Sequence, residues 1–331
     1  MSIPLRYVLE QGPVIRSLGR TALSAMKAPK SGAARGSVPA PGPELRATMP
    51  PRSRELVRDY VRHVGGEPSA YGERLPPHFF PQWGFALAAR TLEGIPYPLM
   101  KVLNGGCRVE IAAALPANEP LEVSACLEDI DDDGRRAVLH QKIVTGTKSV
   151  PNAVTAHLYA IVPLGGGGKG SGSSGSSSGG GEAKKKEVAI VPADARELAR
   201  WSLPANAGLD FAKLTGDFNP VHWIRPYARM FGFKSTILHG FGTMARAWEG
   251  VVAQVLGVDT QAIATFDARF TKPLVLPGKV GLFLVAKDGS PRTGEIYVGD
   301  AAGSPAYLVG SFTSSPAPAR RGRSGPSTAA R

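Results

Sequence analysis

The chain has 331 residues, of which 43% are apolar and 20% charged, with a formal net charge of +12. This composition is typical of a globular protein, and two cysteines, Cys107 and Cys126, exclude a disulfide framework and a multi-cysteine zinc site. Cysteine usage this sparse favours a reducing, cytoplasmic location. The positive charge lies mainly in residues 1–54, 165–187 and 316–331, so we expect no specific nucleic-acid partner.

Composition divides the chain into two pieces of similar length. Residues 165–187, rich in Gly, Ser and Lys, predict a flexible linker between residues 55–164 and 188–315. Each piece is long enough for a core of its own. Residues 1–54 and 316–331 are expected to be disordered basic tails, and the first of them is a candidate for peripheral contact with a membrane surface.

The first piece shows one helix followed by strands. The apolar stretch 79–92 predicts the helix, and alternating patterns then predict four strands, at 107–114, 121–130, 137–147 and 153–162.

The second piece repeats this order. Two helical turns are expected at 210–215 and 226–230, and apolar residues at helical spacing predict a long helix at 240–255. Strands follow at 262–270, 280–286, 295–298 and 306–313. The predicted fold class is therefore α+β, with each half a long helix wrapped by a curved antiparallel sheet.

One short segment carries the residue types of acid–base chemistry. Asp217 and His222 are separated by a tight turn containing Gly216, Asn219 and Pro220, which can direct both side chains to one point. A carboxylate beside an imidazole is a common pairing for activating water. An isolated turn of this kind is more often only a structural Asx turn.

The pair His239-Gly240 precedes the predicted long helix. Free backbone N–H groups and the positive end of the helix dipole make this position suitable for a developing oxyanion. Taken alone, His239 is more often a capping or core histidine, and Gly240 can be glycine merely because the helix packs closely.

Taken together, this segment resembles the MaoC-like dehydratases, the (R)-specific enoyl-CoA hydratases. The resemblance rests on the motif Thr215-Gly216-Asp217-Phe218-Asn219-Pro220-Val221-His222, then Phe231-Gly232-Phe233, Ile237-Leu238-His239-Gly240 and the later Ala268–Pro273 stretch. It implies a hot-dog fold in its double form, in which the first half lacks the motif and shapes the acyl pocket.

The resemblance also implies reversible hydration of trans-2-enoyl thioesters to (3R)-3-hydroxyacyl thioesters. Asp217 and His222 would hold the water, the N–H of Gly240 would bind the thioester oxygen, and Asn219 and His239 would support the turn. No metal or organic cofactor is expected.

The substrate would be an acyl-CoA or an acyl carrier protein thioester, and the active unit a monomer with two paired halves or a homodimer. Candidate pocket residues are Trp223, Phe79, Trp83 and Phe85, with acyl length measured along the 79–92 helix. Candidate partners for CoA phosphates, chosen by charge, are Arg225, Arg229, Lys234 and Lys272.

Two alternatives remain open at this point. One is a hot-dog thioesterase, for which Glu249 on the long helix would supply the carboxylate. The other is a non-catalytic acyl-binding or scaffold subunit. The remaining histidines show no partner pattern and are expected to be structural or exposed: His63, His78, His140 and His157.

Overall fold

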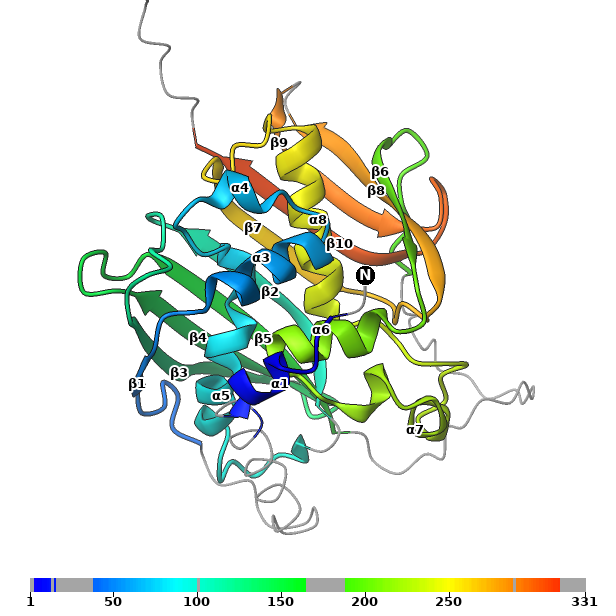
Figure 1. Ribbon diagram of the computed structural model, residues 1–331. Coiled ribbons are helices and arrows are strands. Elements are labelled where there is room, and N and C mark those ends of the chain that lie inside the picture. The colour runs from blue at the N-terminus through cyan, green and yellow to red at the C-terminus, as the bar shows by residue number, and fades with distance from the viewer. Residues whose placement is uncertain are drawn as a thin grey trace, which may run out of the picture.

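A single antiparallel sheet runs through both halves of the chain (Figure 1). The computed structural model describes residues 3–12, 15, 38–99, 102–164, 188–287 and 290–315. The sheet has ten strands in the order β1-β3-β4-β5-β2-β7-β10-β9-β8-β6. Helices from both halves pack on its concave side, so the core lies between helices and sheet.

In the described part of the first half, a short N-terminal helix, α1 (Tyr7–Glu10), comes before the other elements. They are β1 (Leu45–Met49), α3 (Arg54–His63), α4 (Pro68–Tyr71), the 3-10 helix η1 (Pro77–Phe79), α5 (Pro81–Thr91), β2 (Leu103–Ile111), β3 (Leu121–Asp132), β4 (Arg136–Gly146) and β5 (Val154–Pro163).

The second half has the same plan. Its elements are β6 (Arg196–Leu203), α6 (Ala207–Thr215), the 3-10 helix η3 (Pro220–His222), α7 (Arg225–Met230), α8 (Gly240–Gln254), β7 (Ile263–Phe270), β8 (Gly278–Lys287), β9 (Ser290–Gly299) and β10 (Ala306–Ser314).

The strand order reveals a duplicated fold. The first half is ordered β1-β3-β4-β5-β2, and the second, counted from its outer edge, is ordered β6-β8-β9-β10-β7. In each half the first strand is separated from the other four by helices that include a central one, α5 or α8. The predicted α+β class with two helix-wrapped halves is confirmed.

The halves join where β2 pairs antiparallel with β7. Cys107 lies opposite Ala268 and Val109 opposite Phe266. Gly106 has a φ of +149°, and a Cβ there would overlap the carbonyl oxygen of Ala268. A glycine is therefore required for the two backbones to approach this closely.

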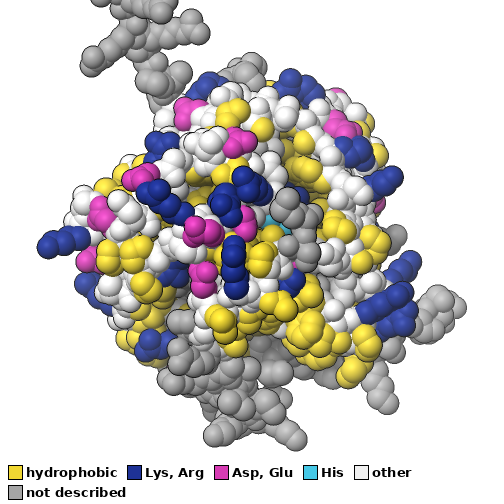
Figure 2. All heavy atoms as spheres, in the orientation of Figure 1, with side chains coloured by type: hydrophobic (Ala, Val, Ile, Leu, Met, Phe, Trp, Pro, Cys, Tyr) yellow, Lys and Arg dark blue, Asp and Glu magenta, His cyan; other side chains and the backbone are white. Residues whose placement is uncertain are grey.

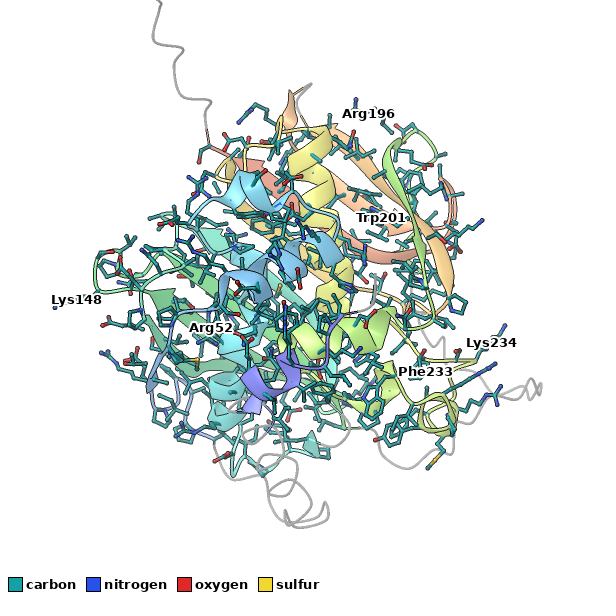
Figure 3. The ribbon with its side chains drawn as sticks, in the orientation of Figure 1. Arg52, Lys148, Arg196, Trp201, Phe233 and Lys234 are labelled. Atoms are coloured by element: carbon teal, nitrogen blue, oxygen red, sulfur yellow. The ribbon has the colours of Figure 1, made fainter. Side chains whose placement is uncertain are left out.

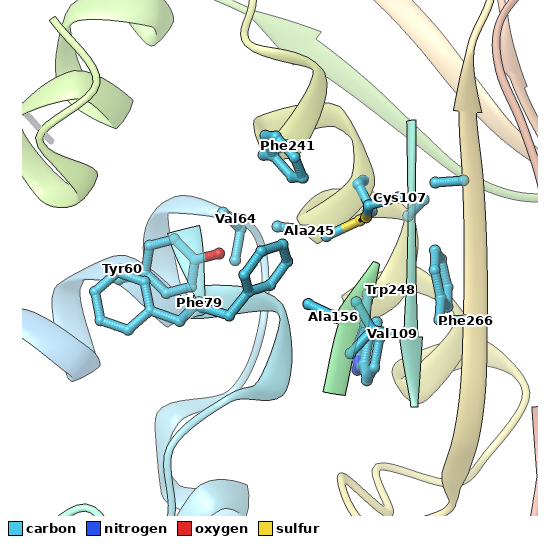
Figure 4. Packing of buried hydrophobic residues seen from close by; sticks show 14 of the residues in the cluster. Tyr60, Val64, Phe79, Cys107, Val109, Ala156, Phe241, Ala245, Trp248 and Phe266 are labelled. Carbon is cyan, nitrogen blue, oxygen red and sulfur yellow. Dashed lines mark hydrogen bonds between the residues drawn. The ribbon is translucent and has the colours of Figure 1, made fainter. Parts of the chain in front are cut away.

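The central helix α8 buries the side chains that its sequence pattern predicts. Met244, Trp248 and Val251 are fully buried. The Trp248 ring stacks on Phe266 of β7 with centroids 4.8 Å apart (Figure 4). Residues at helical spacing thus form one continuous apolar face that covers the sheet near the β2–β7 junction.

The expected boundary at residue 54, between a disordered tail and the first half, is wrong. Helix α1 and strand β1 both lie before it. Tyr7 and Gln11 are fully buried. Strand β1 forms the edge of the sheet by pairing with β3. A basic, Pro-rich composition concealed these short segments, which are stabilised by contacts with distant parts of the chain. The predicted linker 165–187 and the tail 316–331 lie outside the described residues.

Most other predicted elements are found within a few residues of their expected bounds. The sequence patterns missed α3, α4 and β6, whose apolar positions are too few or too irregular to stand out. Within the described ranges, no helix is long and apolar enough to cross a bilayer.

Candidate active site

The sequence motif forms a turn between α6 and α7. Helix α6 ends at Thr215 and is capped by Gly216, which has a φ of +83° and donates its N–H to the carbonyl of Ala212. The N–H of Asn219 then donates to Asp217 Oδ1 over 3.3 Å, and Asn219 Oδ1 accepts from the N–H of Val221 over 3.3 Å. These two Asx turns fix the position of Asp217 between α6 and η3. The second one also begins η3, which carries His222.

His222 is held in one tautomer by the backbone. Its Nδ1 lies 2.9 Å from the carbonyl oxygen of Ile237. Since a carbonyl only accepts, Nδ1 carries the proton and Nε2 keeps its lone pair. Burial lowers the pKa of His222 below its ordinary value, although the nearby Asp217 carboxylate opposes this effect. The side chain is thus a neutral base at neutral pH.

His239 packs against this base. Its ring stacks on that of His222 with centroids 3.5 Å apart, and its Nε2 donates to the carbonyl oxygen of Asp217 over 2.9 Å. Burial and the adjacent His222 lower the pKa of His239 to about 3. His239 therefore stays neutral and fixes the position of the Asp217 backbone.

Glycine is required on both sides of the turn. A Cβ at Gly208 in α6 would overlap the carbonyl oxygen of His222, so α6 can pack this close only without a side chain there. A Cβ at Gly240, the first residue of α8, would lie 2.8 Å from the ring of Phe270. The free N–H groups of the first turn of α8 begin directly after His239.

An apolar path leads away from the start of α8. The ring of Phe241 lies edge-on to Phe270, with centroids 5.6 Å apart, and to Phe85 of α5, with centroids 4.9 Å apart. Phe85 is only partly buried. Of the four predicted pocket residues, it is the one that the structure connects to the helix start.

The other predicted pocket residues have different surroundings. Phe79 is fully buried and stacks on Tyr60, with centroids 3.9 Å apart. Trp83 is fully buried and donates its indole N–H to Thr145 Oγ1. Both lie in the main hydrophobic core. Trp223 is 40% exposed and donates to the carbonyl of Phe218, at the rim of the turn.

The predicted basic residues are exposed. Arg225 and Arg229 lie on α7, and Lys234 follows it, pointing outward beside Phe233 (Figure 3). Basic and hydrophobic side chains gather over this part of the surface (Figure 2). Lys272 lies elsewhere along the chain and packs over the ring of Tyr307 at 5.2 Å.

Glu249 belongs to a buried hydrogen-bond network. Its Oε1 accepts from Tyr71 over 2.8 Å and lies 3.0 Å from His78 Nε2. It is nine residues along α8 from Gly240, a rise of about 13 Å. A carboxylate held there is remote from the Asp217 turn, which removes the structural basis of the thioesterase alternative. These partners could not be predicted from sequence spacing, because Tyr71 and His78 belong to the other half of the chain.

Comparison with known proteins gives the same family for part of the second half. Residues 192–300 match the family model of the MaoC-like domain, which confirms the resemblance for that segment. Over 196 residues the chain is 33% identical to "Enoyl-CoA hydratase ChsH3" of Mycobacterium tuberculosis, covering 59% of this chain and 64% of that relative. The match thus spans less than two thirds of the relative's length.

Solved structures agree on the fold. The crystal structure of HtdX of Mycobacterium tuberculosis superposes with a TM-score of 0.63 and 17% identity, covering 82% of this chain and 100% of that one. A conserved protein of the same organism, described as a double hot-dog fold, gives a TM-score of 0.52 and 13% identity, covering 83% and 96%. The expected double hot-dog architecture is therefore confirmed.

Proposed function

We propose that this chain, whose residues 192–300 match the family model of the MaoC-like domain, reversibly hydrates trans-2-enoyl thioesters to (3R)-3-hydroxyacyl thioesters. The observation that carries the proposal is the tautomer of His222. With Nδ1–H bound to the Ile237 carbonyl, Nε2 is free to accept a proton beside the Asp217 carboxylate. The match to a relative named as an enoyl-CoA hydratase supports the same reaction class.

His222 and Asp217 have different roles in the addition of water. The water oxygen bonds to C3 of the enoyl group while one of its protons passes to His222 Nε2. The electron pair of the C2=C3 bond moves toward the thioester carbonyl, and C2 then receives the proton that His222 took up, with the assistance of Asp217, so both side chains return to their starting states. One water is consumed, and the carbon–carbon double bond becomes single. Dehydration follows the same path in reverse.

The start of α8 stabilises the charge that develops on the thioester oxygen. Backbone N–H groups at Gly240 and the helix dipole would meet the enolate-like oxygen. His239 and Asn219 act as positioning residues, since one holds the Asp217 carbonyl and the other caps η3.

The acyl chain would extend along Phe270, Phe241 and Phe85, and the carrier would lie outside at α7. CoA or an acyl carrier protein would bring phosphate groups to this surface, where Arg225, Arg229 and Lys234 are exposed. Lys272 is a fourth candidate. Because β2 and β7 already pair within one chain, we propose that a single chain is the active unit.

The test incubates the full chain with crotonyl-, octenoyl- and hexadecenoyl-CoA. The rate is measured as the loss of enoyl absorbance, and the configuration of the product by chiral analysis. Asp217→Asn and His222→Ala should each lower kcat by about 10²–10⁴-fold. Exposed Asp259→Asn is the matched control and should keep the wild-type rate. Near-wild-type turnover in either site variant, or a (3S) product, would contradict the proposal.

A further inference from the structure

Three potential metal ligands meet on the outer face of the first half. Glu128 of β3, His140 of β4 and His157 of β5 come from adjacent strands. Buried residues alternate with them along each strand and face α5, so these three side chains project from the opposite side of the sheet. None of them belongs to the proposed active site.

The distances among the three side chains suit a small divalent cation. His140 Nε2 lies 2.9 Å from His157 Nδ1, and Glu128 Oε2 lies 3.5 Å and 3.6 Å from these two nitrogens. Ligands bound at about 2.0–2.2 Å with angles of about 90–110° are separated by about 2.8–3.6 Å. We propose that Glu128, His140 and His157 bind a zinc ion.

Neighbouring side chains orient two of the three ligands. Lys142 Nζ donates to Glu128 Oε1 over 3.2 Å, so the carboxylate is oriented through one oxygen while Oε2 faces the imidazoles. Tyr159 stacks on His140, with ring centroids 5.0 Å apart, and fixes the plane of that ring.

The cluster is open to solvent on one side. The side chains of Glu128, His140 and His157 are 33%, 24% and 16% exposed. Water can therefore complete a tetrahedral shell around an ion held by three protein ligands. Such an ion would join three neighbouring strands of the first half. The proposed catalytic residues lie in the second half, so zinc binding can be tested separately from hydration.

Zinc binding is measured on the untagged full chain after chelator treatment, by equilibrium dialysis with ZnCl2 and by the visible spectrum after adding CoCl2. We expect one ion bound at this site, with cobalt d–d bands of a nitrogen- and oxygen-ligated ion. His157→Gln and Glu128→Gln should each weaken binding by at least about 10–100-fold, the usual cost of losing even an outer-shell partner. Glu122→Gln on β3, outside the cluster, is the matched control.

A second group, Asp217, His222 and His239, also offers three ligand atoms within 4.8 Å of one another. His222→Gln should therefore keep the zinc affinity of the wild type if the outer-face cluster binds the ion. The proposal is overturned if the wild-type chain binds no zinc at 100 µM free ion, or if His157→Gln and Glu128→Gln, each shown to be folded by circular dichroism, bind it as well as Glu122→Gln. Loss of binding in His222→Gln alone would assign the ion to the other group.

Discussion

Glu249 of the second half and His78 of the first half face each other in the core, with Glu249 Oε1 3.0 Å from His78 Nε2. Both side chains are almost completely buried. Tyr71 donates to the same carboxylate oxygen, and Tyr60 bonds to His78 Nδ1. A buried polar network thus connects the two halves. Because it is shielded from solvent, water cannot replace a hydrogen-bond partner that is removed from it.

Removing one member of this pair should destabilise the protein strongly. His78→Phe leaves a buried carboxylate with Tyr71 as its remaining donor, so we expect a loss of about 3–5 kcal/mol in the free energy of unfolding. The double variant His78→Phe/Glu249→Leu should lose less than the sum of the single variants, because no unpaired charge remains. Urea denaturation measures all three, and additive losses would contradict a direct coupling.

The hydration rate should fall on the acid side because His222 must be neutral to accept a proton. Its pKa is lowered from 6.5 by burial. The logarithm of kcat/KM should therefore be flat through neutral pH and fall by about one unit per pH unit only below pH 6.5. Initial rates at constant ionic strength between pH 4.5 and 8 measure this profile. An acid limb with its midpoint above pH 7 would show that another group controls the reaction.

Removing residues 2–12 should destabilise α6, the helix that leads into the Asp217 turn. Lys213 Nζ donates to the Ile3 carbonyl over 3.0 Å, and Gln11 Nε2 donates to the carbonyl of Leu214 over 3.1 Å. Each lost hydrogen bond should cost about 1 kcal/mol, and turnover should fall with stability. Leu9→Ser is the control, since Leu9 is 85% exposed. Equal melting temperatures for the truncated and full chains would refute this dependence.

Acyl-length preference should respond to Phe85 and not to its neighbour Gly84. Phe85→Ala removes the ring that meets Phe241, so the kcat/KM ratio of hexadecenoyl-CoA to crotonyl-CoA should rise by about tenfold. A Cβ at Gly84 would lie 3.1 Å from Ile143 inside the core. Gly84→Ala should therefore lower stability without changing that ratio. An unchanged ratio in Phe85→Ala would remove α5 from the acyl path.

Local patterns in the sequence predicted α8, the strands β3 to β5 and the Asp217 turn. Each depends on residues within about ten positions: an apolar face at helical spacing, strict alternation, or an Asx turn with glycine and proline. The tautomer of His222 could not be predicted, because its partner Ile237 is fifteen residues away and is placed there by the bridge between Ile237 and Val275.

Features that depend on long-range pairing were missed. Strand β6 alternates poorly because it forms a sheet edge. The Glu128 cluster depends on the register of three strands, including an irregularity between Leu127 and Asp129 in β3. Spacing along the chain gives no sign of such a group. The burial of Tyr7 and Gln11 was hidden for the same reason, since their partners lie in α3, α5 and α6.

The pairing of β2 with β7 occupies both edges of each of these strands, because β5 and β10 lie on their other sides. A second chain cannot therefore join the sheet at this junction, and among the described strands it can add only beside β1 or β6. The contact between the halves is also intramolecular, so its occupancy does not depend on protein concentration. Specific activity should consequently stay constant on dilution to nanomolar protein, whereas separate subunits joined at such a seam would dissociate.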